Sequence, residues 1–118
     1  MSQMRCSHFL IKHEGSRNPV SRRTNESTSE LTRAAADAEM DKWIKQLNED
    51  ERPMNEKFAA LANHRSDCGS YANGGDLGWF GPGEMQKAFE DATRATEIGS
   101  VSPPVNSDSG LHIIFRTG

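Results

Sequence analysis

A cysteine in a glycine-flanked loop and two histidines distant from it in sequence are the side chains best suited to chemistry. Cys68 lies in the segment Ser-Asp-Cys-Gly-Ser, and His8 and His112 stand in two apolar runs near the ends of the chain. A cysteine with a histidine partner is the pairing of nucleophilic catalysis. Asp67 works against it, because a neighbouring negative charge disfavours the thiolate. The residues leave two interpretations open, a nucleophile and a loop cysteine without a role.

The two histidines occupy similar places in the first and last predicted strands. If those strands pair, the imidazoles meet inside the sheet. Cys68 and Ser109 would then add to a polar interior that is costly unless it is hydrogen bonded. No third or fourth ligand stands at a spacing suited to a metal, so we expect no metal site. Two hydrogen-bonded core histidines are the ordinary interpretation, and a functional cluster is the alternative.

Positive charge is concentrated at the start of the chain. Residues 1–23 contain five Lys/Arg and one acid, a net charge of +4, whereas the other 95 residues contain nine bases and sixteen acids, a net charge of −7. A general nucleic-acid binder would spread positive charge over a face, so we expect no such function. A local phosphate site is favoured instead, with a solvated charged face as the alternative. The available cations are Lys12, Arg17, Arg22 and Arg23.

These side chains are positioned by a few predicted strands and one long loop. Residues 5–12, 76–80 and 110–117 are typical of strands, and a short strand is predicted near Val105. Residues 13–28 lack apolar periodicity, and loops of that length are usually functional or disordered. With three helices, the order β-α-α-β-α-β-β predicts an α+β domain whose helices pack around a small antiparallel sheet.

The three predicted helices each have an apolar face. The first begins either at a capping box, Ser27-x-x-Glu30, or at Thr32. Its buried face at helical spacing comprises Ala36, Met40, Trp43, Ile44 and Leu47. The second covers residues 55–64, with Phe58, Leu61 and Ala62 inward. The third spans residues 84–94, with Met85, Ala88, Phe89 and Ala92 on one side.

Composition excludes several classes of protein. Of 118 residues, 34% are hydrophobic and the mean hydropathy is −0.76. The longest apolar run has five residues, Phe58-Ala-Ala-Leu-Ala62, whereas a membrane-spanning helix needs about 20. No apolar stretch follows the N-terminal Met-Ser-Gln-Met-Arg, so no secretory signal is expected. Two cysteines cannot form a disulfide framework, which favours an intracellular location.

Six short segments follow one another along the chain. They are Arg5-Cys-Ser-His-Phe-Leu-Ile-Lys-His13, Ser66-Asp-Cys68, Gly75-Asp-Leu-Gly-Trp-Phe80, Gly83-Glu-Met-Gln-Lys-Ala-Phe-Glu-Asp91, Gly99-Ser-Val-Ser-x-Pro-Val105 and Asp108-Ser-Gly-Leu-His-Ile-Ile114. Together they closely resemble the catalytic domain of the parvulin family of peptidyl-prolyl cis-trans isomerases, in its phosphorylation-dependent, Pin-type branch. The resemblance covers essentially the whole chain.

The resemblance implies an FKBP-like α+β fold, in which helices surround a four-stranded antiparallel sheet, and a single domain over residues 1–118. The implied catalytic cluster is Cys68, His8, His112 and Ser109. The implied proline pocket is Leu77, Met85, Gln86 and Phe89, with Phe80 nearby. The loop of residues 13–28 would hold phosphate through Lys12, Arg17, Arg22 and Arg23. The implied partners are proteins or peptides containing pSer/pThr-Pro, neither nucleic acid nor membrane, and we expect a monomer in the cytoplasm and nucleus.

Two departures from the family pattern bear on these expectations. The Pin-type branch usually has two adjacent arginines before a proline, whereas this chain has Arg17-Asn18-Pro19. One phosphate ligand is therefore absent at Asn18, and either Arg22 or Arg23 is available to replace it. Many Pin-type enzymes carry an N-terminal WW domain, but here the catalytic segment begins at residue 5, so we expect a stand-alone catalytic version.

The implied reaction is rotation about an amide bond, whose barrier is about 18–20 kcal/mol. No bond has to break, so no cofactor is expected. The twisted imide has a less polar carbonyl, and an apolar pocket that holds the proline ring favours it. We expect Cys68 to act without covalent attack. The alternatives are a phosphopeptide-binding module with little catalysis and, less well supported, a Cys–His hydrolase.

Overall fold

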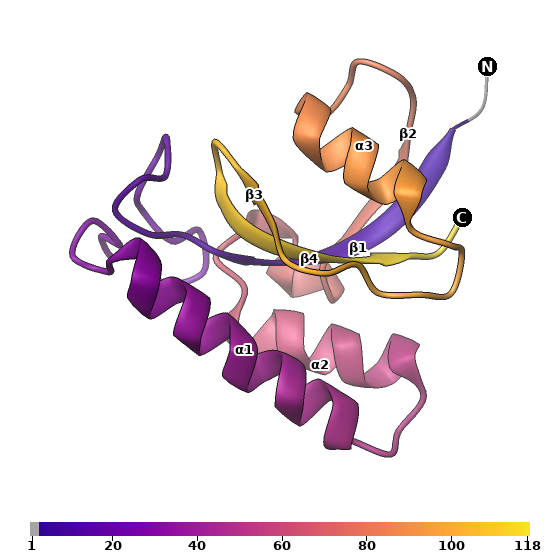
Figure 1. The fold of residues 1–118 in the computed structure, drawn as a ribbon, viewed down its shortest axis with the longest axis horizontal. Helices are drawn as coiled ribbons and strands as arrows, with labels where there is room; N and C mark the ends of the chain where they lie inside the picture. Colours follow the sequence, from indigo (N-terminus) through magenta and orange to yellow (C-terminus); the bar gives the residue numbers. More distant parts are fainter. Residues whose placement is uncertain (1–2) are drawn as a thin grey trace.

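The two ends of the chain form the middle of a four-stranded antiparallel sheet. The computed structural model describes residues 3–118, with the strands in the order β2-β1-β4-β3 (Figure 1). The strands are β1 (Met4–Ile11), β2 (Asp76–Phe80), β3 (Val105–Ser107) and β4 (Gly110–Arg116). The helices are α1 (Arg33–Glu49), α2 (Met54–Arg65) and α3 (Lys87–Ala95), with a short 3₁₀ helix, η1 (Gly69–Asn73), before β2. The predicted fold class and sheet are confirmed.

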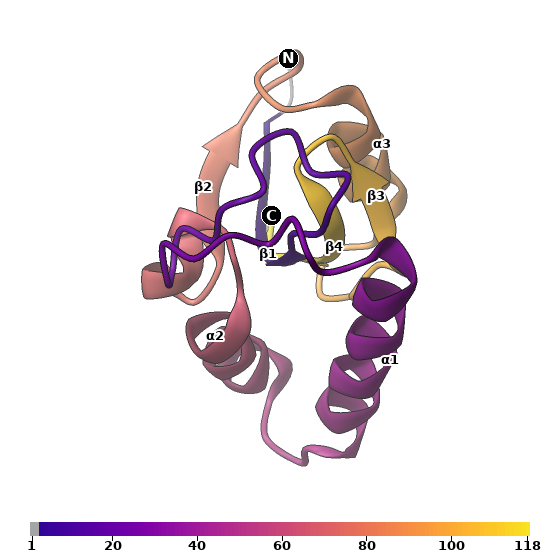
Figure 2. The ribbon, with the colours of Figure 1, turned by 90° about the vertical axis from the view of Figure 1, so that its left-hand side faces the viewer.

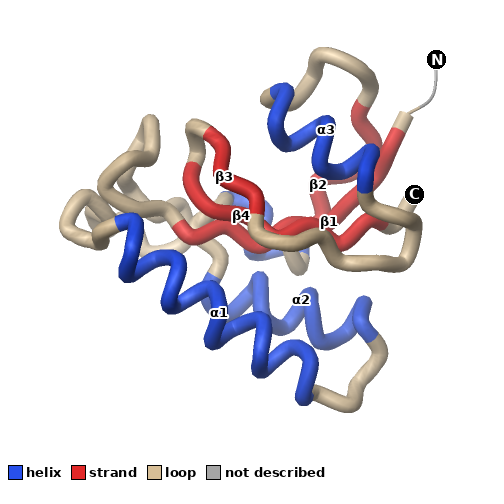
Figure 3. Tube along the Cα trace, in the orientation of Figure 1, coloured by secondary structure: helices blue, strands red, loops and turns tan. Residues whose placement is uncertain are grey.

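Helices cover both faces of the sheet. Helices α1 and α2 lie on one face and α3 lies on the other (Figure 3). The segment between β1 and α1 lies across the end of the sheet (Figure 2). Among residues 3–118, no helix combines the length and the apolar character that crossing a membrane requires.

Alternation along β1 and β4 divides their side chains between two buried clusters. The cluster beneath α1 and α2 includes Phe9, Ile11, Met40, Phe58, Ile113 and Phe115. The cluster beneath α3 consists of Met4, Cys6, Phe80, Phe89 and Ile114. His8 and His112 are in phase with this second cluster, so both imidazoles lie on the α3 face of the sheet.

Helix α1 begins at the later of its two predicted caps. The Oγ1 of Thr32 accepts a hydrogen bond from the Ala35 N–H at 3.1 Å, which satisfies a free donor of the first turn. The predicted capping box at Ser27 is wrong, because the Ser27 Oγ accepts from the N–H of Ser29 within the preceding loop. Of the predicted buried face, Ala36, Met40 and Leu47 are buried, and Trp43 and Ile44 are half-buried against the core.

Helix α3 begins at Lys87, three residues later than predicted. The backbone of Gln86 is extended, and its side-chain amide is engaged elsewhere, because Oε1 accepts from the Asp108 N–H at 3.1 Å and Nε2 donates to Ser109 Oγ at 3.1 Å. Met85 therefore lies before the helix. Ala88, predicted to face the core, is exposed.

The loop of residues 13–28 is held to the body of the protein by backbone hydrogen bonds. The Arg17 N–H donates to the Asp108 carbonyl at 2.7 Å, in the turn between β3 and β4. The Arg22 N–H donates to the Asp67 carbonyl at 2.9 Å, in the segment after α2. The loop therefore has a defined path beside Cys68, although it lacks apolar periodicity.

Candidate active site

Two adjoining cavities open beside Cys68. The larger, about 540 Å³, is lined by Leu10, Lys12, Arg17, Asn18, Arg22, Cys68, Gly69, Ser70, Leu77 and Ser109. The smaller, about 180 Å³, is lined by His8, Cys68, Leu77, Met85, Gln86, Phe89, Ser107, Ser109 and His112. Cys68, Leu77 and Ser109 line both. One cavity is cationic and the other mainly apolar, and Cys68 stands at their junction.

The smaller cavity contains most of the residues predicted for a proline pocket. Leu77 and Met85 are half-buried, and Phe89, in the first turn of α3, is buried. The rings of His8 and His112 contact Phe89 edge-on, with centroids 5.4 and 5.2 Å away. Phe80 does not line the cavity: it is buried behind Phe89, with ring centroids 6.3 Å apart. It therefore supports the wall of the cavity.

The two histidines meet inside the sheet, because β1 and β4 are paired there. His8 stands opposite Ile114, two residues beyond His112, and the two Nδ1 atoms lie 3.0 Å apart. Burial lowers the pKa of His8 to about 4. Burial, followed by the charge of His8, lowers the pKa of His112 to about 3. Both imidazoles are therefore neutral at pH 7, and one Nδ1 donates to the other.

A serine absent from the predicted site completes this histidine pair. The Ser107 Oγ lies 2.6 Å from the His112 Nε2, and it also accepts from the Ser109 N–H at 3.2 Å. Within the described residues, the buried His8 Nε2 has no hydrogen-bond partner. The sequence feature that could have pointed to Ser107 is its position in the short hairpin before His112. Ser109, predicted in the catalytic cluster, bonds through its hydroxyl to Gln86.

Three of the four predicted phosphate ligands surround the larger cavity. Lys12 is buried, and its Nζ donates to the Val20 carbonyl at 2.8 Å, across the loop. Burial, followed by the nearby charge of Arg22, lowers the pKa of Lys12. The side chains of Arg17 and Arg22 have no hydrogen-bond or ion-pair partner within residues 3–118, so their guanidinium groups are free for a ligand.

Arg23 is turned away from this cavity. Its Nε donates to the Ser66 carbonyl at 3.2 Å, and its side chain lines a separate hollow beneath the loop. Asn18, at the position where the family has its second arginine, lines the larger cavity together with Arg22. The structure thus brings Arg22, and not Arg23, into the cavity that Asn18 lines.

Comparison with known proteins identifies the family. The profile described as "Rotamase: PPIC-type PPIASE domain" matches residues 8–118. The chain belongs to the parvulin family of peptidyl-prolyl cis-trans isomerases. It is 47% identical over 116 residues to the peptidyl-prolyl cis-trans isomerase ESS1 of Saccharomyces cerevisiae. The matched region covers 98% of this chain and 66% of that protein.

The isomerase also resembles Pin-type relatives along their full length. It is 44% identical to the peptidyl-prolyl cis-trans isomerase Pin1 of Arabidopsis thaliana over 115 residues, 98% of this chain and 95% of that protein. The solution structure of TbPIN1 superposes with a TM-score of 0.85 and 53% identity, and the match covers 100% of both chains. These relatives assign the chain to the Pin-type branch of the family, and the reaction of that family is isomerisation of X-Pro bonds.

Proposed function

We propose that this isomerase acts preferentially on X-Pro bonds in which the residue before proline is phosphoserine or phosphothreonine. The observation that carries the proposal is the junction of the two cavities at Cys68, Leu77 and Ser109. A phosphate in the larger cavity and a proline ring in the smaller one would leave the bond between them beside Cys68.

The charge of the larger cavity suits a phosphate. A phosphorylated side chain carries a charge of about −1.5 to −2 and three acceptor oxygens. Arg17 and Arg22 offer two guanidinium forks, which match phosphate oxygens bidentately, and Lys12 adds a point charge fixed by its bond to Val20. An unphosphorylated serine would leave these cations without a partner, so preference for the phosphorylated residue follows.

The smaller cavity supplies the conditions that favour a twisted imide. When the amide rotates, it loses resonance and its carbonyl becomes less polar, so a dry apolar wall favours the rotated state over the solvated planar one. Leu77, Met85 and Phe89 would hold the proline ring while the phosphate fixes the preceding residue. Rotation breaks no bond, and Cys68 then acts through the electrostatics and packing of the junction rather than by covalent attack.

The histidine pair organises this site. Because both imidazoles are neutral and buried, neither is suited to carry charge during the reaction. Their mutual bond and the bond of His112 to Ser107 brace the wall of the smaller cavity behind Phe89. We assign them a positioning role rather than proton transfer.

The natural partners would be proteins or peptides that contain pSer/pThr-Pro. We propose a monomer as the functional form. The free thiols of Cys6 and Cys68 fit an intracellular location, in the cytoplasm and nucleus.

A protease-coupled isomerisation assay on a pSer-Pro peptide tests this function. Charge-assisted hydrogen bonds contribute about 1.5–3 kcal/mol each, so Arg17→Ala should lower kcat/KM for this peptide about 10–100-fold. The same variant should leave the unphosphorylated peptide nearly unaffected, and Cys68→Ala should lower turnover of both. Arg52→Ala, which removes an arginine that lines neither cavity, is the matched control.

Three outcomes would overturn the proposal. Wild-type binding of the phosphopeptide without turnover would indicate a binding module. Peptide hydrolysis as the only product would indicate a Cys–His hydrolase. Equal effects of Arg17→Ala on the phosphorylated and unphosphorylated peptides would show that the larger cavity does not bind phosphate.

A further inference from the structure

One residue, Asp67, holds the backbone on both sides of the larger cavity. Its Oδ2 accepts from the Lys12 N–H at 3.0 Å, at the end of β1. Its carbonyl oxygen accepts from the Arg22 N–H at 2.9 Å, in the loop, and its own N–H donates to the Leu10 carbonyl at 2.8 Å. The next residue is Cys68. Asp67 therefore determines the spacing between two of the cavity's cations and the cysteine at the junction.

Asp67 places a negative charge next to Lys12 and Arg22, two of the residues that would bind a phosphate. Its side chain is 3% exposed, so water screens this charge poorly. A dianionic phosphate among Lys12, Arg17 and Arg22 would be repelled by an uncompensated carboxylate behind them. The buried carboxylate thus needs a cation that is not itself used for the ligand.

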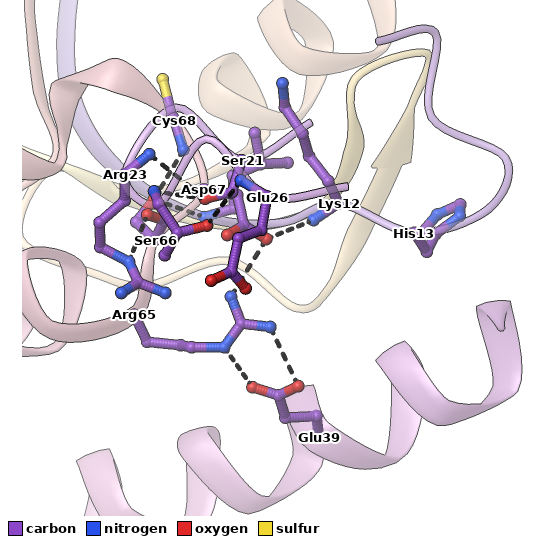
Figure 4. A network of polar contacts seen from close by, with 12 residues as sticks. Lys12, His13, Ser21, Arg23, Glu26, Glu39, Arg65, Ser66, Asp67 and Cys68 are labelled. Atoms are coloured by element: carbon purple, nitrogen blue, oxygen red, sulfur yellow. Dashed lines mark hydrogen bonds and ion pairs between the residues drawn. The ribbon is translucent and has the colours of Figure 1, made fainter. Parts of the chain in front are cut away.

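Arg65, the last residue of α2, meets that need. Its Nη1 lies 3.1 Å from the Asp67 Oδ2, and its Nε and Nη2 reach the Glu39 carboxylate at 2.5 and 3.0 Å (Figure 4). Its side chain is 18% exposed and lines neither of the two site cavities. Of the two residues that Arg65 pairs with, only Asp67 is bonded to residues that line the larger cavity.

Glu39 anchors the far side of Arg65 on α1. Its Oε2 also accepts from the Trp43 indole N–H at 2.8 Å. Burial alone would raise the pKa of Glu39, but the hydrogen bonds from Arg65 and Trp43 outweigh it and the pKa lies below its usual value. Glu39 is thus ionised at pH 7, and it fixes the guanidinium of Arg65 in one orientation beneath Asp67.

We propose that Arg65 is a positioning and selectivity residue of this isomerase: by neutralising Asp67 and holding its carboxylate, it allows the larger cavity to accept a phosphate. This inference rests on the proposed preference for phosphorylated substrates. The property it determines is the ratio of kcat/KM for a pSer-Pro peptide to kcat/KM for the same peptide unphosphorylated. A residue that only stabilises the fold would change both values together.

The test measures this ratio by steady-state kinetics in Arg65→Met and Arg65→Lys, with urea unfolding as a check of the fold. Arg65→Met should lower the ratio about tenfold, mainly through a higher KM for the phosphopeptide, because an uncompensated charge now opposes the ligand. Arg65→Lys, which keeps the charge, should recover most of the ratio. Arg52→Met is the matched control: it removes an arginine that pairs with Asp50 and lines neither site cavity, and it should leave the ratio within about twofold of wild type.

A double variant keeps the test decisive where Arg65→Met is too unstable to assay. Asp67→Asn with Arg65→Met removes both charges and keeps an acceptor for the Lys12 N–H, so its ratio should return to that of wild type. An unchanged ratio in Arg65→Met, or a double variant whose ratio stays about tenfold below wild type, would overturn the inference while leaving the proposed function intact. A wild-type protein without preference for the phosphopeptide would overturn both.

Discussion

Replacing His8 by leucine tests whether the buried histidine pair is neutral. The folded pKa of His8 is about 4 and that of His112 is about 3, below the ordinary value of 6.5, and burial is the main cause. A histidine whose pKa falls on folding binds its proton more readily in the unfolded chain. Its contribution to stability is therefore present above pH 6.5 and is lost as the pH falls toward its folded pKa.

The size of this loss follows from the two pKa values. Between pH 7 and pH 5, a histidine with a pKa of 6.5 unfolded and about 4 folded loses about 2 kcal/mol of its contribution to unfolding free energy. His112, with the lower folded pKa, loses about the same amount over this range. The wild-type protein should lose about 4 kcal/mol through the pair, and His8→Leu should lose about half of that.

Urea unfolding at pH 5, 6 and 7 measures how the unfolding free energies of the wild type and of His8→Leu change with pH. His64→Gln, which removes an exposed histidine of α2, is the control, and its unfolding free energy should fall between pH 7 and pH 5 by as much as that of the wild type. His8→Leu should also lower stability at pH 7 and reduce turnover in step with it, because the role is positioning. The same pH dependence in His8→Leu and wild type would refute the reasoning, and so would a large loss of turnover at unchanged stability.

Three further predictions concern the junction, a glycine and a helix cap. Cys68→Ser and Cys68→Asp should keep measurable isomerase activity, because no covalent bond forms; loss of all turnover in both folded variants would contradict this. Gly75→Ala should lower the unfolding free energy by about 2–4 kcal/mol, because φ is +84° and a Cβ would lie 2.3 Å from the His8 carbonyl oxygen. Gly78 has a φ of +73° but open space around it, so Gly78→Ala should cost only about 1 kcal/mol. Urea unfolding measures both values. Thr32→Ala should cost about 1 kcal/mol and Ser27→Ala almost nothing, and the reverse order would place the cap of α1 at Ser27.

The fold was predictable because its signals are local. Strand-like segments at both ends of the chain predicted β1 and β4, and the meeting of His8 and His112 was predicted on the condition that these two strands pair. The start of α1 was ambiguous because Ser27 and Thr32 are both suitable cap residues, whereas the start of α3 depends on hydrogen bonds across the structure. The amide of Gln86 binds the turn before β4 instead of continuing the helix.

The residues that line the two cavities could be anticipated in part from residue type alone. Leu77, Met85 and Phe89 are apolar, and the cations of the loop are the only basic cluster near the start of the chain. The direction of a long side chain is not encoded in its type, so Arg22 and Arg23 were indistinguishable until the path of the loop was known. Arg65 was missed for a related reason, since its partner on α1 is 26 residues away in sequence.

The preference of the wild-type protein for a phosphorylated substrate tests the central claim most directly. Two-dimensional exchange NMR, which follows cis-trans exchange without a coupling protease, gives kcat/KM for one peptide with serine and with phosphoserine before its proline. Two arginines that each contribute about 1.5–3 kcal/mol predict a ratio of at least about 100 in favour of the phosphopeptide. Equal values for the two peptides would contradict the assignment of a phosphate to the cavity of Lys12, Arg17 and Arg22.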